Sequence, residues 1–318
     1  MSLVGVKRFP LQINYIEDII SDPSFKTLPQ LVKKASSVIQ ETCDRIAKSR
    51  QLTAPSDSMI KAQYTMIVEL IRAKVALGTG VLIFVSGIAE ITELQLKFEG
   101  IDIYRVVVIH GDIPFEEQQL AFVPAGPDEI KIVIATNAAE SSITLPDVDT
   151  VICMGTHKTV QYDNTQYLES NNRANRASLV KCWISKASAT QRAGRTARTR
   201  PGTAYRLYSR SLFENCLVDH EQAEVFRKPL HDVILNLMTI FTSPEGNEED
   251  NLDDEDADER NRKYNGKQQK KSSLMISDGF VGPILNDLIE PPAVENVHKS
   301  FQHLYDGMFC FLCLLNVA

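Results

Sequence analysis

Apolar runs and helical stripes alternate along most of the chain. Six segments have the apolar content of β-strands, namely residues 9–15, 81–85, 105–109, 130–136, 148–154 and 203–208. Helical periods fall before or between them, at residues 28–50, 60–75, 89–98 and 115–122. The run Val81–Val85 is apolar throughout, which is typical of a strand buried on both faces. Strands separated by helices form right-handed βαβ units, so we expect an α/β fold with a mostly parallel sheet and helices on both faces.

The pattern changes after residue 208. Leu230, Val233, Ile234, Leu237, Met238 and Phe241 form one helical stripe, and Val294, Val297, Phe301, Leu304 and Tyr305 form another. Between the stripes, residues 242–276 pass from an acidic run to a Lys/Arg/Gln-rich run with almost no apolar content. Such a segment cannot offset its ordering entropy by burial, which predicts a disordered insertion. Residues 158–162 and 179–184 are candidate strands of a hairpin.

Composition excludes several classes of protein. The chain has 318 residues with 43% hydrophobic content, enough for one large or two medium domains, and no run of about 18 apolar residues. No secretory signal is visible at the start, and six scattered cysteines indicate free thiols in a reducing compartment. Cys310 and Cys313 have CxxC spacing, but without a second pair they indicate buried packing rather than a metal site. We therefore expect an intracellular protein, in the nucleus or cytoplasm, with no membrane contact and no bound structural metal.

The net charge of −7 is unevenly distributed. Ten carboxylates lie between Glu245 and Glu259, and without them the chain carries about +3. Residues 170–212 contain no Asp or Glu but ten Lys and Arg residues. This distribution predicts a local polyanion site on an otherwise ordinary surface.

The densest cationic stretch is residues 188–200, SATQRAGRTARTR. If it is one helix, Gln191, Arg195 and Arg198 lie at i, i+4 and i+7 and share a face. Guanidinium groups bind phosphate oxygens bidentately and stay charged at working pH, so this face suits a polyphosphate. A solvated basic helix face explains the same residues, and the stretch alone does not decide between the two.

Short polar segments follow three of the predicted strands. They are Ser86-Gly87, His110-Gly111-Asp112 and Thr136-Asn137. In parallel sheets, ligands bind beyond the carboxyl ends of the strands. We therefore expect these segments and the loop before Gln191 to line one edge of the sheet.

Three longer motifs occur in this order along the chain: Val81–Gly87, Ala135–Thr144 and Ile184–Arg198. They resemble motif IV, motif V and motif VI with its leader in the second RecA-like domain of DEAH-box ATP-dependent RNA helicases. The similarity covers most of residues 9–242 and 281–307. It implies a RecA-like domain over residues 1–215 and a small, mainly helical, partial winged-helix domain over residues 216–318, with the insertion at about 243–277.

The resemblance implies a role in ATP hydrolysis for motif VI. Gln191 and Arg195 would contact the γ-phosphate, and Arg198 would be the arginine finger that reaches ATP held by a partner domain. Arginine fingers stabilise the charge of the phosphoryl-transfer transition state. Arg192 and Arg200 are interpreted as salt-bridged or solvated.

Further nucleotide contacts are implied outside motif VI. Phe122 matches the aromatic residue that stacks on adenine, although a core aromatic at a helix end is the rival interpretation. Ser142 matches the serine that senses the γ-phosphate, and Thr144 is either a second contact or a capping and packing residue. The ribose-binding aspartate of many relatives aligns with Pro146, so Asp147, one position later, is the candidate here.

The same resemblance implies contacts with single-stranded RNA. Thr136 and Asn137 would touch the sugar-phosphate backbone, which positions nucleic acid without reading its sequence. Ser86, Gly87, His110 and Gly111 would face the RNA, although His110 could equally be an ordinary loop histidine. Residues near 162–178 would form the strand-separating hairpin, and the acidic insertion is a candidate surface for protein partners.

Two departures from the family pattern stand out. Motif VI usually has glycine where this chain has Ala197, which could crowd a turn. The sequence also contains no Gly-x-x-x-x-Gly-Lys-Ser/Thr and no Asp-Glu-x-His after a strand. We therefore expect ATP and Mg²⁺ to be shared with a first RecA-like domain, and this chain alone to hydrolyse essentially no ATP. The alternatives are a non-enzymatic RNA-binding or scaffold protein, and an unrelated nucleotide-binding α/β enzyme.

Overall fold

The computed structural model describes residues 9–23, 30–141, 145, 147–162, 177–227, 230–242 and 283–315. The chain forms two compact units. Unit 1 comprises the chain up to residue 160 together with residues 178–221, and unit 2 comprises residues 161–177 and 222–318. The predicted insertion at 243–277 and residues 163–176 of the predicted wedge lie outside the described residues.

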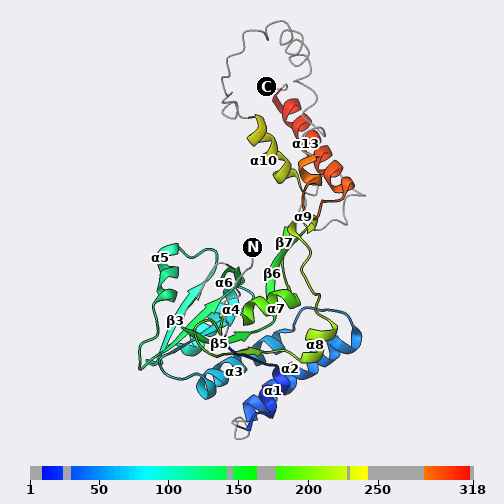
Figure 1. Cartoon of the computed structure of the whole chain (residues 1–318). Coiled ribbons are helices and arrows are strands. Elements are labelled where there is room, and N and C mark those ends of the chain that lie inside the picture. Colours follow the sequence, from blue (N-terminus) through cyan, green and yellow to red (C-terminus); the bar gives the residue numbers. More distant parts are fainter. Residues whose placement is uncertain are drawn as a thin grey trace, which may run out of the picture. The chain divides into compact units, whose positions relative to one another are not determined.

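Unit 1 is built on a six-stranded sheet in which every pairing is parallel (Figure 1). The strand order is β1-β8-β5-β2-β4-β3. The strands are β1 Leu11–Asn14, β2 Thr79–Phe84, β3 Tyr104–Ile109, β4 Ile130–Ala135, β5 Val148–Cys153 and β8 Gly202–Arg206. All six predicted strands are therefore confirmed, and so is the mostly parallel α/β fold.

Helices connect the strands and cover the sheet. They are α1 Ile16–Ser21, α2 Gln30–Ser49, α3 Asp57–Lys74, α4 Ile88–Phe98, α5 Phe115–Gln118, the 3₁₀ helix η2 Gln119–Phe122, α6 Ala138–Ser141, α7 Lys186–Ala193 and α8 Arg210–Asn215. Figure 1 shows α3 below the sheet and α7 above it. Ser56 caps α3 by accepting a hydrogen bond from the Met59 amide. The polar segments after β2, β3 and β4 consequently emerge at one edge.

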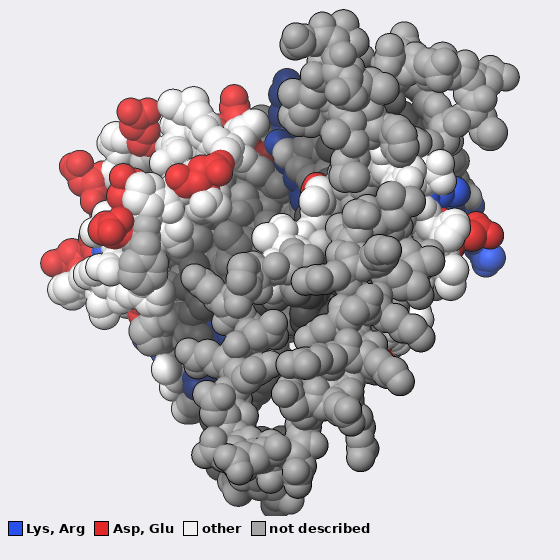
Figure 2. All heavy atoms as spheres, turned by 90° about the horizontal axis from the view of Figure 1, so that it is seen from above, with Lys and Arg blue, Asp and Glu red and all other residues white. Residues whose placement is uncertain are grey.

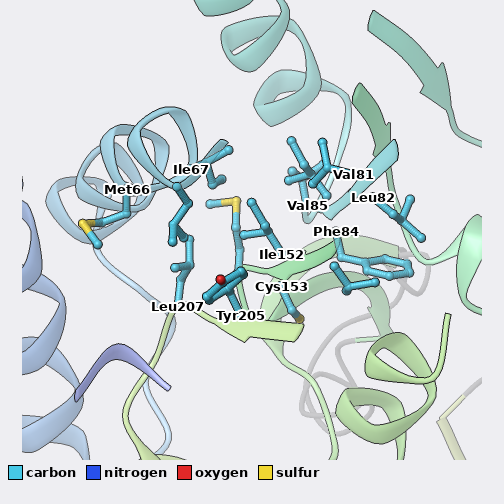
Figure 3. Close-up of a cluster of buried hydrophobic side chains, with 14 of the residues drawn as sticks. Met66, Ile67, Val81, Leu82, Phe84, Val85, Ile152, Cys153, Tyr205 and Leu207 are labelled. Carbon is cyan, nitrogen blue, oxygen red and sulfur yellow. The ribbon is translucent and has the colours of Figure 1, made fainter. Parts of the chain in front are cut away.

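The hydrophobic core includes both faces of the sheet, and the part of it next to α3 is shown in Figure 3. Val81, Ile83 and Phe84 of β2 are completely buried, as expected of a central strand with helices on both faces. Met66 and Ile67 of α3 pack on the same cluster. Burial of such side chains contributes roughly 1.5–3 kcal/mol each and is the main stabilising term of the unit.

One buried polar side chain fastens α3 to the sheet. Gln63 is completely buried and its Nε2 donates hydrogen bonds to the carbonyls of Met154, at 2.9 Å, and Leu207, at 2.8 Å. These carbonyls directly follow β5 and β8 and would otherwise be buried without a partner. The amide therefore fixes how far along the strands the helix sits.

A second sheet pairs β6 Thr156–Tyr162 with β7 Ala177–Trp183, which confirms the two predicted strands around residues 158–162 and 179–184. Trp183 is buried, and its Nε1 donates to the Thr53 carbonyl at 2.8 Å. Its ring meets Tyr208 edge to face, with centroids 6.2 Å apart. The base of the hairpin is thus part of the core of unit 1.

In unit 2 the described elements after residue 222 are helices: α9 Glu224–Arg227, α10 His231–Thr242, a short helix at 283–286 and α13 Val294–Leu315. Leu230, Ile234 and Leu285 are buried together against Val297, Phe301 and Leu304 of α13. The two predicted stripes therefore meet, although Val233, Val294 and Tyr305 are exposed. The winged-helix assignment of this region stays a prediction.

Gly155 provides a test of packing at the hairpin base. Its φ of +83° is left-handed, and a Cβ atom there would lie 2.6 Å from Tyr208 Cδ1 and 3.1 Å from Trp183 Cζ3. We expect Gly155→Ala to lower the free energy of unfolding by about 3 kcal/mol or more, because the strain of a left-handed alanine adds to an overpacked core. The control is Gly100→Ala, which has φ +74° but no atom within 4 Å of its Cβ and should lose only about 1 kcal/mol. Urea unfolding measures both, and equal losses would contradict the packing argument.

Candidate functional site

The arginine-rich segment lines an open pocket of about 610 Å³ in unit 1. The helix α7 begins after Ser185, whose hydroxyl accepts a hydrogen bond from the Ser188 amide. Gln191, Arg195 and Arg198 all line the pocket, with the lining completed by Lys186, Ala187, Thr190, Gly194, Asp219 and His220. The three predicted phosphate-binding side chains therefore reach one cavity.

They do so without sharing a helix face, so the single-helix prediction for residues 191–198 is wrong. α7 ends at Ala193, and Gly194 is its C-cap. Thr196 Oγ1 lies 2.8 Å from the carbonyl oxygens of both Val148 and Asp149, which draws the chain onto the start of β5. Turns rather than a helix bring the two arginines to the pocket.

The electrostatics of the pocket are those of two neighbouring cations. Partial burial and the charge of Arg198 both lower the pKa of the Arg195 guanidinium, and Glu140 acts in the opposite direction. Arg198 Nε donates to the Gly194 carbonyl at 3.4 Å. A guanidinium stays protonated at neutral pH even after such a shift, so the repulsion favours binding of a polyanion between the two side chains.

Arg192 has a different role, because its side chain is completely buried. Its Nε donates to Glu140 Oε2 at 2.9 Å, its Nη1 donates to the Thr156 carbonyl at 3.1 Å, and its guanidinium lies 5.0 Å from the Phe84 ring centroid. The predicted salt bridge of Arg192 is thus present. It joins α7 to α6, the helix that follows the Thr136-Asn137 segment.

The predicted edge of polar segments is formed by β2, β4 and β3, whose last residues Phe84, Ala135 and Ile109 are in register. Thr136 follows β4, and its amide donates to the Ile109 carbonyl at 3.1 Å. Its neighbour Asn137 is exposed. After β3, His110 is half-buried and Gly111 is exposed. These four residues therefore lie together, with polar groups of Asn137 and Gly111 open to solvent.

Ser86 and Gly87 after β2 are buried, and a lysine accounts for part of that burial. A Cβ atom on Gly87 would lie 2.8 Å from Lys158 Nζ and 2.9 Å from its Cε, so the Lys158 side chain crosses the glycine. Ser86 is next to Glu90, a buried carboxylate that forms an ion pair with Lys181. Burial acts to raise the pKa of Glu90, but the hydrogen bond from Lys181 is part of what holds it below its usual value.

Phe122 ends η2 with 40% of its surface exposed. It is not a core aromatic, which removes the rival interpretation for this residue. The neighbouring side chains Leu120 and Val123 are also exposed. The loop therefore presents an apolar surface to solvent.

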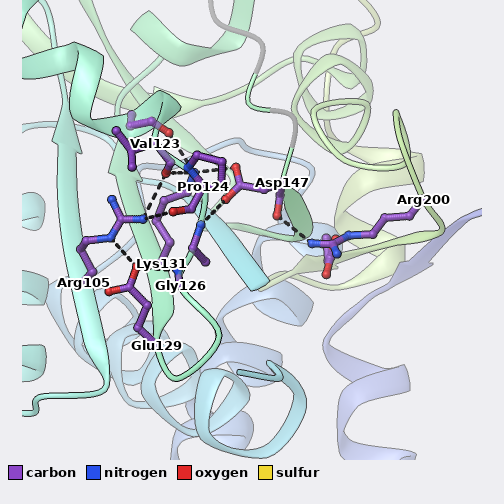
Figure 4. A network of polar contacts seen from close by, with 11 residues as sticks. Arg105, Val123, Pro124, Gly126, Glu129, Lys131, Asp147 and Arg200 are labelled. Carbon is purple, nitrogen blue, oxygen red and sulfur yellow. Dashed lines mark hydrogen bonds and ion pairs between the residues drawn. The ribbon is translucent and has the colours of Figure 1, made fainter. Parts of the chain in front are cut away.

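Asp147 is held by contacts within the unit (Figure 4). Its Oδ1 accepts a hydrogen bond from Lys131 Nζ at 2.5 Å, and its Oδ2 accepts one from the Ala125 amide at 3.1 Å. Arg200, next to it, pairs with Asp149 and donates to the Asp147 carbonyl at 3.1 Å, so the salt-bridge interpretation of Arg200 is also confirmed.

The chain is similar to known helicases in sequence and in fold. Residues 62–200 match the family model described as the helicase conserved C-terminal domain. The chain is 38% identical to the mouse ATP-dependent RNA helicase DHX29 over 52% of its own length and 12% of that protein. It is 34% identical to the Arabidopsis thaliana helicase DExH1 over 51% of its length and 16% of that protein. The chain thus spans only a small part of these relatives.

A putative DEAH-box helicase of Mycosarcoma maydis aligns over a longer stretch, with 28% identity over 74% of this chain and 16% of that protein. Among solved structures, the Escherichia coli DEAH/RHA helicase HrpB superposes with a TM-score of 0.54 at 20% identity, over 74% of this chain and 24% of that one. Residues 62–200 are therefore a helicase C-terminal domain with a RecA-like α/β fold, similar to that of DEAH-box RNA helicases.

Two predicted nucleotide contacts of the helicase domain, Ser142 and Thr144, lie outside the described residues. The described ranges contain no cluster of three His, Cys, Asp or Glu side chains able to hold a metal ion. None of the helices in those ranges has the length and apolar content to cross a membrane. The four cysteines whose side chains are described are free thiols, and burial raises the pKa of Cys43 to about 11.

Sequence reasoning missed three charged residues of the helicase domain. Lys131 interrupts the apolar strand β4, and a charge at a buried strand position is itself a signal that a partner must exist. Glu140 is the only carboxylate within motif V, so it is the obvious counter-ion for a buried arginine. Lys158 could not have been found, because its approach to Gly87 depends on how the hairpin β6–β7 folds back.

Ala197 gives a stability test of motif VI. It is buried with φ +58°, a left-handed conformation that glycine adopts at no steric cost. We expect Ala197→Gly to raise the free energy of unfolding by about 1 kcal/mol, because it relieves that strain. The control is Ala189→Gly within α7, which should lower it by about 1 kcal/mol. Thermal or urea unfolding would show both, and a destabilised Ala197→Gly protein would contradict the argument.

Proposed function

We propose that this chain supplies one half of an ATP site and part of a track for single-stranded RNA. The observation that carries the proposal is the convergence of Gln191, Arg195 and Arg198 on one open pocket. Arg192, within the same segment, is buried as an ion pair instead. One arginine of the segment is therefore part of the folded core, while two others line a cavity whose charge suits phosphate. A basic helix face that is merely solvated would not need this arrangement.

In the proposed mechanism the pocket residues act on ATP held by a first RecA-like domain. Gln191 orients the γ-phosphate by hydrogen bonding, and Arg195 offsets its charge. Arg198 is the finger that stabilises the charge developing in the transition state, which is the main catalytic demand of phosphoryl transfer. The adenine ring stacks on the exposed Phe122, and Ser142 and Thr144 complete the phosphate contacts.

Magnesium would accompany the nucleotide rather than bind to this chain. The pocket contains one carboxylate, Asp219, and Lys186 pairs with it at 2.9 Å. Mg²⁺ prefers several oxygen ligands in octahedral geometry, which this lining does not provide.

The RNA backbone would follow the edge formed by Gly111, His110, Thr136 and Asn137. Short polar side chains and backbone amides there position nucleic acid without selecting bases. Lys158, whose ammonium lies over Gly87, adds a cation to the same edge. Figure 2 shows acidic side chains gathered on the side of unit 1 that carries α5, and Glu116 and Glu117 of that helix are exposed. Lys and Arg side chains are visible nearer the middle of the view. The RNA would avoid the acidic side.

The alternatives are less well supported. A scaffold protein would have no need for two arginines in an open pocket, and the relatives are named as ATP-dependent helicases. If the chain were an unrelated nucleotide-binding enzyme, the match of residues 62–200 to the helicase domain would have no explanation. We place the native work of the chain in ATP-driven movement along RNA, within the nucleus or cytoplasm.

The ATPase proposal is tested by joining the chain to a first RecA-like domain of the DEAH-box family. We expect RNA-stimulated ATP hydrolysis, and a loss of about 10³-fold or more in kcat for Arg195→Ala or Arg198→Ala. The 318-residue chain alone should show no measurable turnover. Arg210→Ala is the control, because Arg210 is exposed and pairs with Asp18 outside the pocket. Turnover by the chain alone that Arg195→Ala abolishes would contradict the shared site.

The RNA track is tested by the salt dependence of binding to an oligouridine. We expect Lys158→Ala to reduce the slope of log K against log salt by about 0.7, the value for one phosphate contact on a single strand. Lys97→Ala, at an exposed position of α4, should leave the slope unchanged. The proposal for Lys158 is wrong if the two variants have the same slope as the unchanged chain.

A further inference from the structure

A completely buried lysine holds the loop that carries Phe122. Lys131 lies within β4, and its Nζ donates to the Ala121 carbonyl at 2.9 Å, the Val123 carbonyl at 3.1 Å and Asp147 Oδ1 at 2.5 Å. An ammonium has three protons to donate, so all of them are used. The two carbonyls belong to the residues on either side of Phe122, whose backbone is therefore held from both directions.

Arg105 holds the continuation of the same loop (Figure 4). Its Nη2 donates to the Val123 carbonyl at 3.1 Å and the Pro124 carbonyl at 2.7 Å, while its Nε donates to Glu129 Oε1 at 2.8 Å. The loop amides are bound as well, because Glu129 Oε1 accepts from Gly126 and Asp147 Oδ2 accepts from Ala125. Each cation thus has a carboxylate partner, and both carboxylates also bind the loop.

The charged state of buried Lys131 depends on its ion pair with Asp147. Burial lowers the pKa of the Lys131 ammonium, and the hydrogen bond and charge of Asp147 oppose that shift. A buried ammonium without a counter-ion would be costly enough to lose its proton or draw in water. Asp147 is therefore what allows Lys131 to hold three acceptors in an apolar setting.

Charged groups lie beneath the loop, while its apolar side chains point outward. Leu120, Phe122 and Val123 are 57%, 40% and 50% exposed, although all three could gain by burial. A loop whose backbone is fixed by two ion pairs does not rearrange to cover them. The result is a rigid apolar surface centred on an aromatic ring, which suits a flat partner such as a nucleobase.

We propose that Lys131, Asp147 and Arg105 are positioning residues that hold Phe122 ready to stack on the base of the nucleotide. The inference rests on the proposed function and deepens it. It assigns Asp147 to the support of the stacking loop instead of to the ribose, because both carboxylate oxygens are already engaged inside the unit. Ordering the loop in advance removes part of the entropy cost of nucleotide binding.

The experiment uses the 318-residue chain labelled with 4-fluorophenylalanine, with the Phe122 resonance assigned by Phe122→Leu. The ¹⁹F spectrum is recorded without nucleotide and then during titration to millimolar ATP or inorganic tripolyphosphate. Tripolyphosphate tests the arginine pocket without a base or ribose. Urea unfolding establishes that each variant is folded, and Asp147→Asn and Lys131→Met are both used in case one does not fold.

We expect both variants to move the Phe122 resonance before any ligand is added. ATP should then bind about fivefold more weakly or worse, since stacking of one base is lost, while tripolyphosphate affinity stays within about twofold. Arg72→Met removes a cation from the exposed ion pair with Glu69 and should change none of these readings. The nucleotide-free shift separates positioning from direct binding.

Three results would overturn the inference. One is an unmoved Phe122 resonance in both nucleotide-free variants. The second is weaker ATP binding by Asp147→Asn without that shift, which would make Asp147 a direct ligand. The third is a Phe122 resonance that does not shift when ATP is added to the unchanged chain, although tripolyphosphate still binds. Failure of tripolyphosphate to bind at all, or binding that Arg195→Ala leaves intact, would instead count against the proposed phosphate pocket.

Discussion

The buried guanidinium of Arg192 is the interaction on which the rest of the domain depends. It reaches Glu140 on α6, the Thr156 carbonyl on β6 and the ring of Phe84 on β2, so one side chain joins four elements. Removing one partner of a buried ion pair typically costs about 3–5 kcal/mol, because the other charge is left without compensation. The proposed phosphate pocket and the proposed RNA edge are therefore joined through one side chain, and a displacement of α7 would directly displace α6.

Much of this fold could be predicted because the strands are short, apolar and separated by clear helical periods. The apolar run Val81–Val85 and the stripe of α3 each identify a buried element without tertiary information. The path of residues 194–200 could not be predicted, because it depends on Thr196 reaching the start of β5, a contact between residues about fifty positions apart. Local helical spacing favoured the wrong backbone shape there, although the three side chains that it grouped together do line one pocket.

Phe122 and Asp147 show where reasoning from motifs is weakest. Both were identified by alignment to a family pattern, yet exposure of the ring and occupation of the carboxylate depend on Lys131 and Arg105, which the motifs do not include. In a search for hydrophobic periodicity, a charged residue inside an apolar strand counts only as an interruption. It nevertheless indicates that the charge has buried partners in the fold. For sheets of this type, such interruptions are good places to look for the supports of a functional loop.

The position of β8 has a consequence for synthesis of the chain. β8 lies between β1 and β5, so the first strand made has no partner in the sheet until residues 202–206 have left the ribosome. Contacts over such separations are slow to form and leave strand edges exposed meanwhile. Arg195 and Arg198 lie in the segment between α7 and β8. A nascent chain that stalls directly after motif VI would therefore carry the arginines but not the strand that follows them, and would be a natural target for chaperones.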